Sequence, residues 1–407
     1  MNTLLKIAWR NLWRNKRRTL ITSASVFLAV FLALFMRSMQ IGSYEIMIDS
    51  VVKETGHLQV HDSGYWESKS INNSFEYTAA LKEEIESHKN IKSIIPKLET
   101  FALGSYGQST KGFMLQGIDP ELEDPRRKIS NKLIEGRFLN ENDEGIVLAE
   151  GLAKFFQIGI NDTLVLIGQG YQGISAIGIF PVVGIVKYPI PKLNNLMAYM
   201  SLSKVQETFA PYHPGLVSAL VLDVGDDKNL ALTAKEINAS IGTNYEVMPW
   251  TVMQPEVVQQ IAGDNVGGII MLAILYLVVA FGILGTILMM TMERRKEFAI
   301  MVAVGMHRGK LAIVVCIETI FIGLLGIVSG ILVSLPFLQY LYFNPIPITG
   351  ETAELMLEFN QEPIMPFSLE TTIFTNQGIT ILVLALLTAI YPIVFVNRFK
   401  ILKAMRS

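Results

Sequence analysis

Four long apolar runs dominate the pattern of hydrophobic and polar positions along the chain, at residues 19–39, 265–291, 311–342 and 377–397. A membrane hydrocarbon core about 30 Å thick needs about 20 mostly apolar residues in a helix, and each run meets this requirement. The sequence therefore predicts four membrane-spanning helices. Because Pro336 interrupts the third run, we expect its outer end to kink or to leave the membrane.

The first apolar run has one feature of a signal peptide, since basic residues precede it. Its apolar part is longer than the ~7–15 residues typical of a signal peptide, and no A-x-A-like cleavage site follows it. We therefore interpret this run as an uncleaved span.

The stretch between the first two runs, residues 40–264, has the composition of a soluble domain. Strand-like alternation occurs at residues 57–61, 111–117, 163–168 and 217–224, and helical patterns occur at 78–89, 152–156, 202–209 and 230–241. Linkers rich in glycine and proline flank a smaller all-β insert, placed at residues 130–200. The predicted fold is a membrane protein with four transmembrane helices in a 1+3 arrangement and a large α+β extracytoplasmic domain between the first two.

Lysine and arginine gather on one side of the predicted membrane. They are frequent in residues 1–18, 292–310 and 398–407, whereas the loop at 343–376 holds five glutamates and no lysine or arginine. Basic loops remain in the cytoplasm, so both termini and the 292–310 segment are predicted to be cytoplasmic, and the large domain periplasmic, in a bacterial inner membrane. The paired tryptophans Trp9 and Trp13 predict an interfacial amphipathic helix over residues 1–18.

Composition supports a membrane protein and offers little sign of catalysis. The chain is 51% hydrophobic and 17% charged, and its formal net charge of -2 argues against a nucleic-acid partner. The single cysteine, Cys316, cannot form an intrachain disulfide. His57 and His61 would lie about 13 Å apart on a strand, too far to share a metal ion. We expect no metal site, no bound cofactor and no enzymatic activity in this chain.

The cytoplasmic segment at residues 292–310, MERRKEFAIMVAVGMHRGK, contains a partial match to a phosphate-binding loop. Only three residues separate its two glycines, where the motif needs four, and Leu311 stands where a serine or threonine would reach Mg²⁺. No strand is predicted before it. We therefore do not expect this chain to hydrolyse ATP.

The same segment has the spacing of an amphipathic helix. Phe298, Met301, Val302 and Gly305 fall on one face, and Gly305 is a plausible C-cap. Two interpretations are open. The helix lies among lipid headgroups, or it is a knob that enters a cleft on a cytoplasmic partner, with flanking charges fixing the register.

The sequence ERRKEFAIMVAVGMHRGKL, followed by IETIFIGLLGIVSG, resembles the signature of FtsX-like permeases, the membrane subunits of MacB-type (type VII) ABC transporters. The matching positions are Arg294, Lys296 (in place of the usual arginine), Glu297, Ala303, Gly305, Glu318, Gly323, Gly326 and Gly330. The ends AWRNLWRNKRRTLIT and YPIVFVNRFKILKAMRS also resemble the family, although its common Asp-Pro is missing; the matching tail positions are Pro392, Arg398, Ala404 and Arg406. Within the family, GFMLQGIDPELED and residues 133–167 are most similar to the lipoprotein-releasing permeases of the LolC/LolE type.

This resemblance implies a non-catalytic permease subunit of an ABC transporter. It implies two cytoplasmic ATPase subunits, which hold the ATP and Mg²⁺, and a second permease that is an identical chain or a paralogue. ATP-driven closure would be transmitted by long first and second spans to the periplasmic domains, which would extract lipoproteins from the inner membrane for a periplasmic carrier. MacB-like export and FtsX-like signalling to a cell-wall hydrolase are the alternatives. The candidate ATPase-coupling residues are Arg294, Arg295, Glu297, Phe298, Met301, Val302 and Gly305.

Three further sets of residues in the spans are candidates for function. Large apolar side chains suit acyl chains or a dimer seam, although core packing explains them equally well; they are Phe27, Phe31, Phe35, Met36, Met271, Leu275 and Phe281. Glu318 is the clear ionisable exception in the spans, and we favour hydrogen bonding to a neighbouring helix over substrate contact. The glycines Gly323, Gly326 and Gly330 are expected to allow close helix approach.

Overall fold

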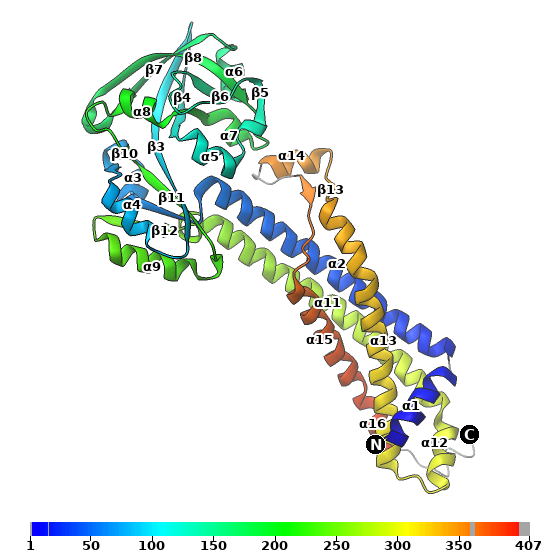
Figure 1. Cartoon of the computed structure of the whole chain (residues 1–407). Helices are drawn as coiled ribbons and strands as arrows, with labels where there is room; N and C mark the ends of the chain where they lie inside the picture. Colours follow the sequence, from blue (N-terminus) through cyan, green and yellow to red (C-terminus); the bar gives the residue numbers. More distant parts are fainter. Residues whose placement is uncertain (1, 15, 359–362, 399–407) are drawn as a thin grey trace. The chain divides into compact units, whose positions relative to one another are not determined.

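The computed structural model describes residues 2–14, 16–358 and 363–398, which divide into two compact units (Figure 1). Unit 1 comprises residues 1–46, 260–347 and 364–407, and unit 2 comprises residues 47–259 and 348–363. The predicted tail at 399–407 lies outside the described residues. The two units are taken in turn below.

Unit 1 is built from long helices. Its elements are α1 (Asn2–Arg14), α2 (Lys16–Thr55), α11 (Pro255–Glu293), α12 (Arg295–Ala303), α13 (Arg308–Phe343), β13 (Ile346–Pro347), β14 (Ile364–Met365), α15 (Thr371–Thr388) and α16 (Ile390–Arg398). By length and composition, four stretches of the described residues are able to cross a membrane: Thr19–Thr55, Pro255–Glu293, Arg308–Phe343 and Thr371–Val396. Each predicted apolar run falls largely within one of these stretches.

The first two spanning helices are longer than the apolar runs that predicted them. Helix α2 continues past Met39 to Thr55, and α11 begins at Pro255 instead of at residue 265, so each helix includes residues of both units. Apolar length alone sets the predicted bounds, whereas the last turns of α2 are amphipathic. There Ile48, Val51 and Val52 pack against the hydrophobic core of unit 2 and prolong the helix.

Prolines affect the third and fourth spans differently. Helix α13 runs unbroken through Pro336, whereas the fourth span is interrupted at Ala389, between α15 and α16. Pro392 lies three residues after this interruption. It has no backbone N–H to donate to a carbonyl of the preceding helical turn. Pro392 therefore accounts for the break between α15 and α16. At Pro336, where we expected the third span to kink or to leave the membrane, helix α13 does not end.

The glycines of α13 lie against neighbouring helices. A Cβ atom added at Gly326 would lie 2.5 Å from the Cβ of Val26 and 2.9 Å from the carbonyl oxygen of Ser23 on α2. At Gly330 the corresponding distance to the Cβ of Val30 is 2.7 Å, and at Gly323 the neighbour is Ala385 of α15, at 3.2 Å. Only a residue without a side chain permits this approach of α13 to α2.

We expect Gly326→Leu to prevent normal packing of α13 on α2, because the new side chain would meet backbone as well as side-chain atoms. Overpacking of this kind costs about 1–3 kcal/mol or more. The measurement is thermal unfolding of the detergent-purified chain. The matched control is Gly285→Leu on α11, where a Cβ would meet nothing within 4 Å. Equal unfolding temperatures for the two variants would contradict the close approach.

Unit 2 mixes strands and short helices. Its strands are β1 (Leu58–Asp62), β2 (Phe75–Glu76), β3 (Ile91–Tyr106), β4 (Ser109–Ile118), β5 (Leu133–Gly136), β6 (Ile146–Ala149), β7 (Thr163–Gln169), β8 (Ser175–Val186), β9 (Met197–Ser201), β10 (Leu216–Val217), β11 (Ala219–Val224) and β12 (Tyr245–Pro249). Its helices are α3 (Tyr65–Ser68), α4 (Ala79–Glu86), α5 (Pro120–Arg127), α6 (Glu150–Phe156), α7 (Pro191–Leu196), α8 (Leu202–Phe209), α9 (Leu230–Ile241), α10 (Trp250–Met253) and α14 (Glu351–Glu358). The strands and helices predicted from periodicity between residues 57 and 241 are confirmed in type and approximate position.

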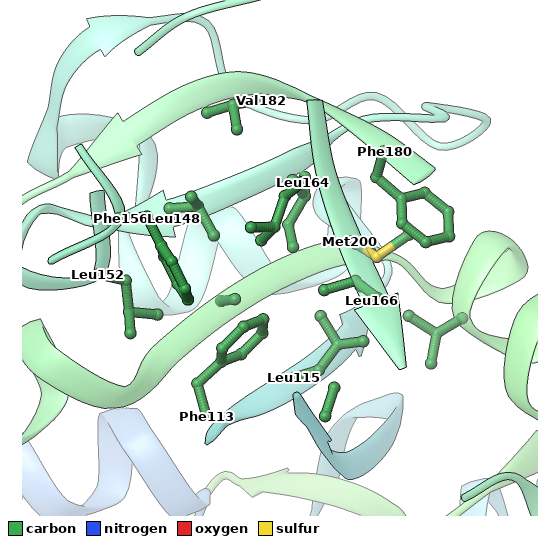
Figure 2. Packing of buried hydrophobic residues seen from close by; sticks show 14 of the residues in the cluster. Phe113, Leu115, Leu148, Leu152, Phe156, Leu164, Leu166, Phe180, Val182 and Met200 are labelled. Atoms are coloured by element: carbon green, nitrogen blue, oxygen red, sulfur yellow. The ribbon is translucent and has the colours of Figure 1, made fainter. Parts of the chain in front are cut away.

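A closed barrel forms one half of unit 2. Its strands pair in the order β3-β4-β9-β6-β8-β7, and β7 pairs back with the second half of β3. Alternate side chains of these strands fill the interior, among them Phe113, Leu148 and Leu166, and α6 contributes Leu152 and Phe156 (Figure 2). Closure leaves β7 with a partner on each side, so the barrel needs no further element to cover it.

The other half of unit 2 is an open sheet in the order β12-β1-β11-β3. Residues of α4 and α9 join the hydrophobic core that includes Leu58, Leu220 and Trp250. Strand β3 spans both halves, because residues 91–97 pair with β11 and residues 102–105 pair with β7. The all-β insert predicted at 130–200 therefore differs from the structure: the barrel starts within β3 and contains α6.

Candidate functional site

Helix α12 is a separate short helix in the segment between two spans. Helix α11 ends at Glu293, Arg294 is the N-cap, and α12 runs from Arg295 to Ala303. At its end Gly305 has a φ of 104°, and its N–H donates to the carbonyl of Val302 at 3.1 Å. The N–H of Met306 donates to the carbonyl of Met301 at 3.0 Å, which completes a Schellman motif. Both ends of α12 are thus fixed by local backbone geometry.

A polar cluster, buried at Arg294 and Glu318 and exposed at Arg14, connects α12 with α1 and α13. Arg294 is 8% exposed and forms an ion pair with Glu318 of α13, which is 5% exposed. The Nδ2 atom of Asn11 on α1 donates to Oε1 of Glu318 at 2.6 Å. Glu297 accepts from Nε of Arg294 at 3.3 Å and from a guanidinium nitrogen of Arg14 at 2.5 Å. Each carboxylate is therefore bound by two side chains: Glu297 by Arg294 and Arg14, and Glu318 by Arg294 and Asn11.

The charge state of this cluster follows from its surroundings. Burial by itself would lower the pKa of Arg294, but Glu318 and Glu297 beside the guanidinium raise that pKa above its ordinary value. Arg294 is therefore a permanent cation, and its ring contact with Phe298, 5.2 Å from the guanidinium carbon to the ring centroid, covers one face of it.

The apolar stripe predicted on α12 points into the chain's own core. Phe298 is 1% exposed and packs with Leu311, Val315 and Val396, and Met301 and Val302 are partly buried against the same cluster. Sequence periodicity finds an apolar stripe but does not reveal which surface covers it. In the structure that surface belongs to α13 and α16.

The opposite face of α12 is open and follows the spacing i, i+4, i+8. It presents Lys296, Ile300 and Val304, and the last two are 56% and 83% exposed. Arg295 lies partly buried between the two faces, and Gly305 is exposed at the helix end. Most of the coupling residues predicted from the sequence are therefore buried or partly buried, whereas Gly305 is exposed.

The apolar residues predicted for the first two spans fall into two groups. On α2, Phe31 and Phe35 lie 5.5 and 6.3 Å from the ring of Phe337 on α13, and Phe27 stacks on Phe31; Met36 is partly buried in the same cluster. On α11, Leu275 packs against this cluster, whereas Met271 and Phe281 are 61% and 65% exposed. The structure therefore brings the phenylalanines of α2 together with α13 and leaves much of α11 uncovered within the single chain.

Unit 2 contains a second buried charge cluster that sequence analysis did not find. Arg127 of α5 is 3% exposed and forms ion pairs with Glu54, in the last turn of α2, and with Glu123. It also donates to Oε1 of Gln116 at 2.9 Å and to the hydroxyl of Tyr199 at 3.2 Å. Burial by itself would lower the pKa of Arg127, but these carboxylates raise it. The only hint in the sequence is the Pro-Arg-Arg that ends α5.

An exposed apolar face lies on the outside of the barrel. By strand register, Leu103 of β3 lies opposite Ile167 of β7, which lies opposite Ile177 of β8. Phe101 and Ile179 extend this face along β3 and β8. The neighbouring residues Ala102, Leu166 and Ala176 belong to the core inside the barrel. These parts of the strands therefore carry apolar side chains on both the inner and the outer face. Contiguous apolar surface of this kind marks interaction sites.

Comparison with known proteins gives consistent results. The FtsX-like permease C-terminal family matches residues 269–401. The lipoprotein-releasing system transmembrane protein LolC of Neisseria meningitidis is 24% identical over 258 residues, covering 60% of this chain and 61% of LolC. LolE of Haemophilus influenzae is 23% identical over 274 residues, covering 63% of each. The matched part thus spans about three fifths of these relatives. The solved periplasmic region of MacB from Actinobacillus actinomycetemcomitans is 15% identical, with a TM-score of 0.35, over 51% of this chain and 95% of that structure.

Proposed function

Because residues 269–401 form an FtsX-like permease domain, and the chain is homologous to LolC and LolE, we propose that it is the permease subunit of an ABC transporter. It would lie in the inner membrane as a multi-pass protein with both termini in the cytoplasm, and would work beside a second permease, identical or paralogous. A separate cytoplasmic ATPase, two copies in the assembly, would bind and hydrolyse ATP. The permease would convert that cycle into movement of unit 2 on the periplasmic side.

The observation that carries this proposal is the attachment of α12. A helix that only lay among lipid headgroups would need no buried ion pair, whereas α12 is fixed to α1 and α13 through Arg294, Glu297 and Glu318. Because of these contacts, a displacement of α12 would also move the start of the spanning helix α13. Removing Arg294 would leave the buried carboxylate of Glu318 without its cation, which costs about 3–5 kcal/mol.

The route from the cytoplasm to unit 2 is proposed to run through the two long helices. Helix α2 has Phe31 and Phe35 against α13, and its last turns are held within unit 2 by Glu54 and by apolar contacts. Helix α11 likewise begins in unit 2, where Val257 and Val258 pack on the same core. Continuous helices transmit displacement along their axes better than loops do.

We propose that the ATPase binds the open face of α12, formed by Lys296, Ile300 and Val304. A helix that enters a groove is anchored by apolar residues at helical spacing, and the flanking charge sets orientation. Because Phe298 is covered by the chain's own residues, it would support the helix instead of contacting the partner.

Replacing both Ile300 and Val304 with aspartate is expected to abolish co-purification of the ATPase from native membranes, because two charges would enter an apolar cleft. Both side chains are exposed, so the variant should still insert and fold. The matched control is Leu232→Asp on α9, an exposed leucine of unit 2 that should leave ATPase binding unchanged. An unchanged amount of ATPase bound to the double variant would remove α12 as the docking element.

The proposed cargo is a lipoprotein extracted from the inner membrane for a periplasmic carrier. Two observations support it. The similar proteins LolC and LolE belong to lipoprotein-releasing systems, and the apolar face of Phe101, Leu103, Ile167, Ile177 and Ile179 on the barrel suits an apolar partner. The test is to trap the complex with an ATPase that binds but does not hydrolyse ATP, and to identify what co-purifies. Lipoproteins would support release, whereas an outer-membrane duct would favour MacB-like export and a cell-wall hydrolase would favour FtsX-like signalling.

A further inference from the structure

A cavity of about 790 Å³ opens in unit 1 where α2 begins and α11 ends. Its walls come from the end of α1, the first turns of α2 and the last turns of α11. The residues that line it are Trp13, Arg14, Lys16, Arg17, Ile21, Thr286, Met289 and Met290. None of the described residues that line the cavity is acidic. The cavity takes no part in the contacts of α12 described above, apart from Arg14.

The cavity has a positive end. Arg14, Lys16 and Arg17 contribute three cationic side chains, and α2 begins at Lys16, so the positive end of the α2 dipole adds to them. Arg14 also forms an ion pair with Glu297, which offsets part of its charge. The remaining positive charge of Lys16 and Arg17, together with the helix end, favours an anion with phosphate-like geometry.

The cavity also has an apolar end. Ile21 of α2 and Met289 and Met290 of α11 form a wall within the stretches that are long and apolar enough to span a membrane. Trp13 lies beside the cationic residues and is half exposed. A tryptophan at the boundary between charged and apolar surfaces is typical of the membrane interface. A small water-soluble anion would use the positive end and leave this apolar wall without a role.

From this combination we infer that the cavity is a binding site for an anionic phospholipid. The phosphate would contact Lys16 and Arg17, and an acyl chain would lie along Ile21 and Met289. Basic pockets between spanning helices on the cytoplasmic side are suited to such headgroups. The general attraction of basic segments to the inner leaflet does not explain the site, because it requires no cavity. The inference depends on membrane insertion but not on the proposed transport function.

The experiment places the full chain in nanodiscs of phosphatidylcholine containing a minor fraction of phosphatidylglycerol with brominated acyl chains, which quench tryptophan. The Trp13→Phe variant isolates the signal of Trp13 from that of the other tryptophans. We expect brominated phosphatidylglycerol to quench Trp13 more than brominated phosphatidylcholine at the same fraction. We expect Lys16→Gln with Arg17→Gln to reduce this preference about tenfold, because each cation near an anionic surface contributes to binding.

Two further variants distinguish lipid binding in the cavity from the general attraction of basic segments to anionic lipid. Lys6→Gln with Arg10→Gln removes the same charge from exposed positions of α1 that do not line the cavity, and it should retain the preference. Ile21→Phe keeps every charge and adds no tryptophan but narrows the apolar end, and it should lose the preference. Since Ile21 is exposed, this variant should fold even if the charge variants do not. Equal quenching by both lipids in the wild-type chain, loss of preference in the Lys6 and Arg10 variant, or displacement by soluble glycerol phosphate would each overturn the inference.

Discussion

Arg294→Gln is expected to destabilise unit 1 by about 3–5 kcal/mol, because it leaves the buried carboxylate of Glu318 without its cation; under the proposed function it should also uncouple ATP hydrolysis from transport. After the substitution, the hydrogen bond from Asn11 at 2.6 Å would be the main remaining support for that carboxylate. Glu297 would retain only its contact with Arg14. Thermal unfolding of the purified chain measures the first effect, and ATPase activity compared with cargo release measures the second.

A second variant separates the cost of leaving Glu318 without a cation from the loss of the contact between Arg294 and α13. Arg294→Gln combined with Glu318→Gln removes both members of the ion pair, so it should recover most of the stability while transport stays impaired. The surface control is Lys6→Gln on α1, because Lys6 is exposed and takes no part in the contacts of Glu297 and Glu318 described above. If Arg294→Gln unfolds at the wild-type temperature, the ion pair contributes nothing to the attachment of α12.

Much of unit 1 was predictable because apolar length is a strong signal. The number of spans followed from four runs of about 20 residues, and the sequence identified Gly326 and Gly330, which lie against Val26 and Val30. Glu318 was recognised as an exception, but its partners Asn11 and Arg294 were not, since they come from segments far apart in the chain. Nothing in local periodicity reports such distant pairs.

The burial of the predicted apolar stripe of α12 has the same physical origin. Phe298, Met301 and Val302 form the apolar stripe, and a stripe is buried by whichever apolar surface is nearest in the fold. That surface is the chain's own α13 and α16, and it leaves Ile300 and Val304 exposed. In unit 2, strands were predictable from alternation, but the closure of the barrel by pairing of β7 with β3 is a long-range event.

Arg127→Leu is expected to have a comparable effect in unit 2. The substitution would leave Glu54 without its cation and the Oε1 atom of Gln116 without its donor, at a cost of about 3–5 kcal/mol, while the hydroxyl of Tyr199 would keep its hydrogen bond with Tyr188. Glu123 would keep its ion pair with Arg126 at 2.7 Å, so α5 itself should remain helical. The loss should therefore be greatest where the last turn of α2 joins α5, β4 and β9.

Hydrogen exchange of the full chain would locate this effect, with faster exchange expected at the end of α2 and in β9. Under the proposed function, ATP hydrolysis by the partner should continue while cargo release falls, because the last turn of α2 would lose its ion pair and keep only its apolar contacts within unit 2. Arg127→Lys should be intermediate, since an ammonium cannot reach all four partners in the guanidinium geometry. The control is Lys82→Leu on α4, which breaks the exposed ion pair with Glu86 and should cost about 0–1 kcal/mol. If Arg127→Leu behaves like this control, the buried cluster does not hold α2.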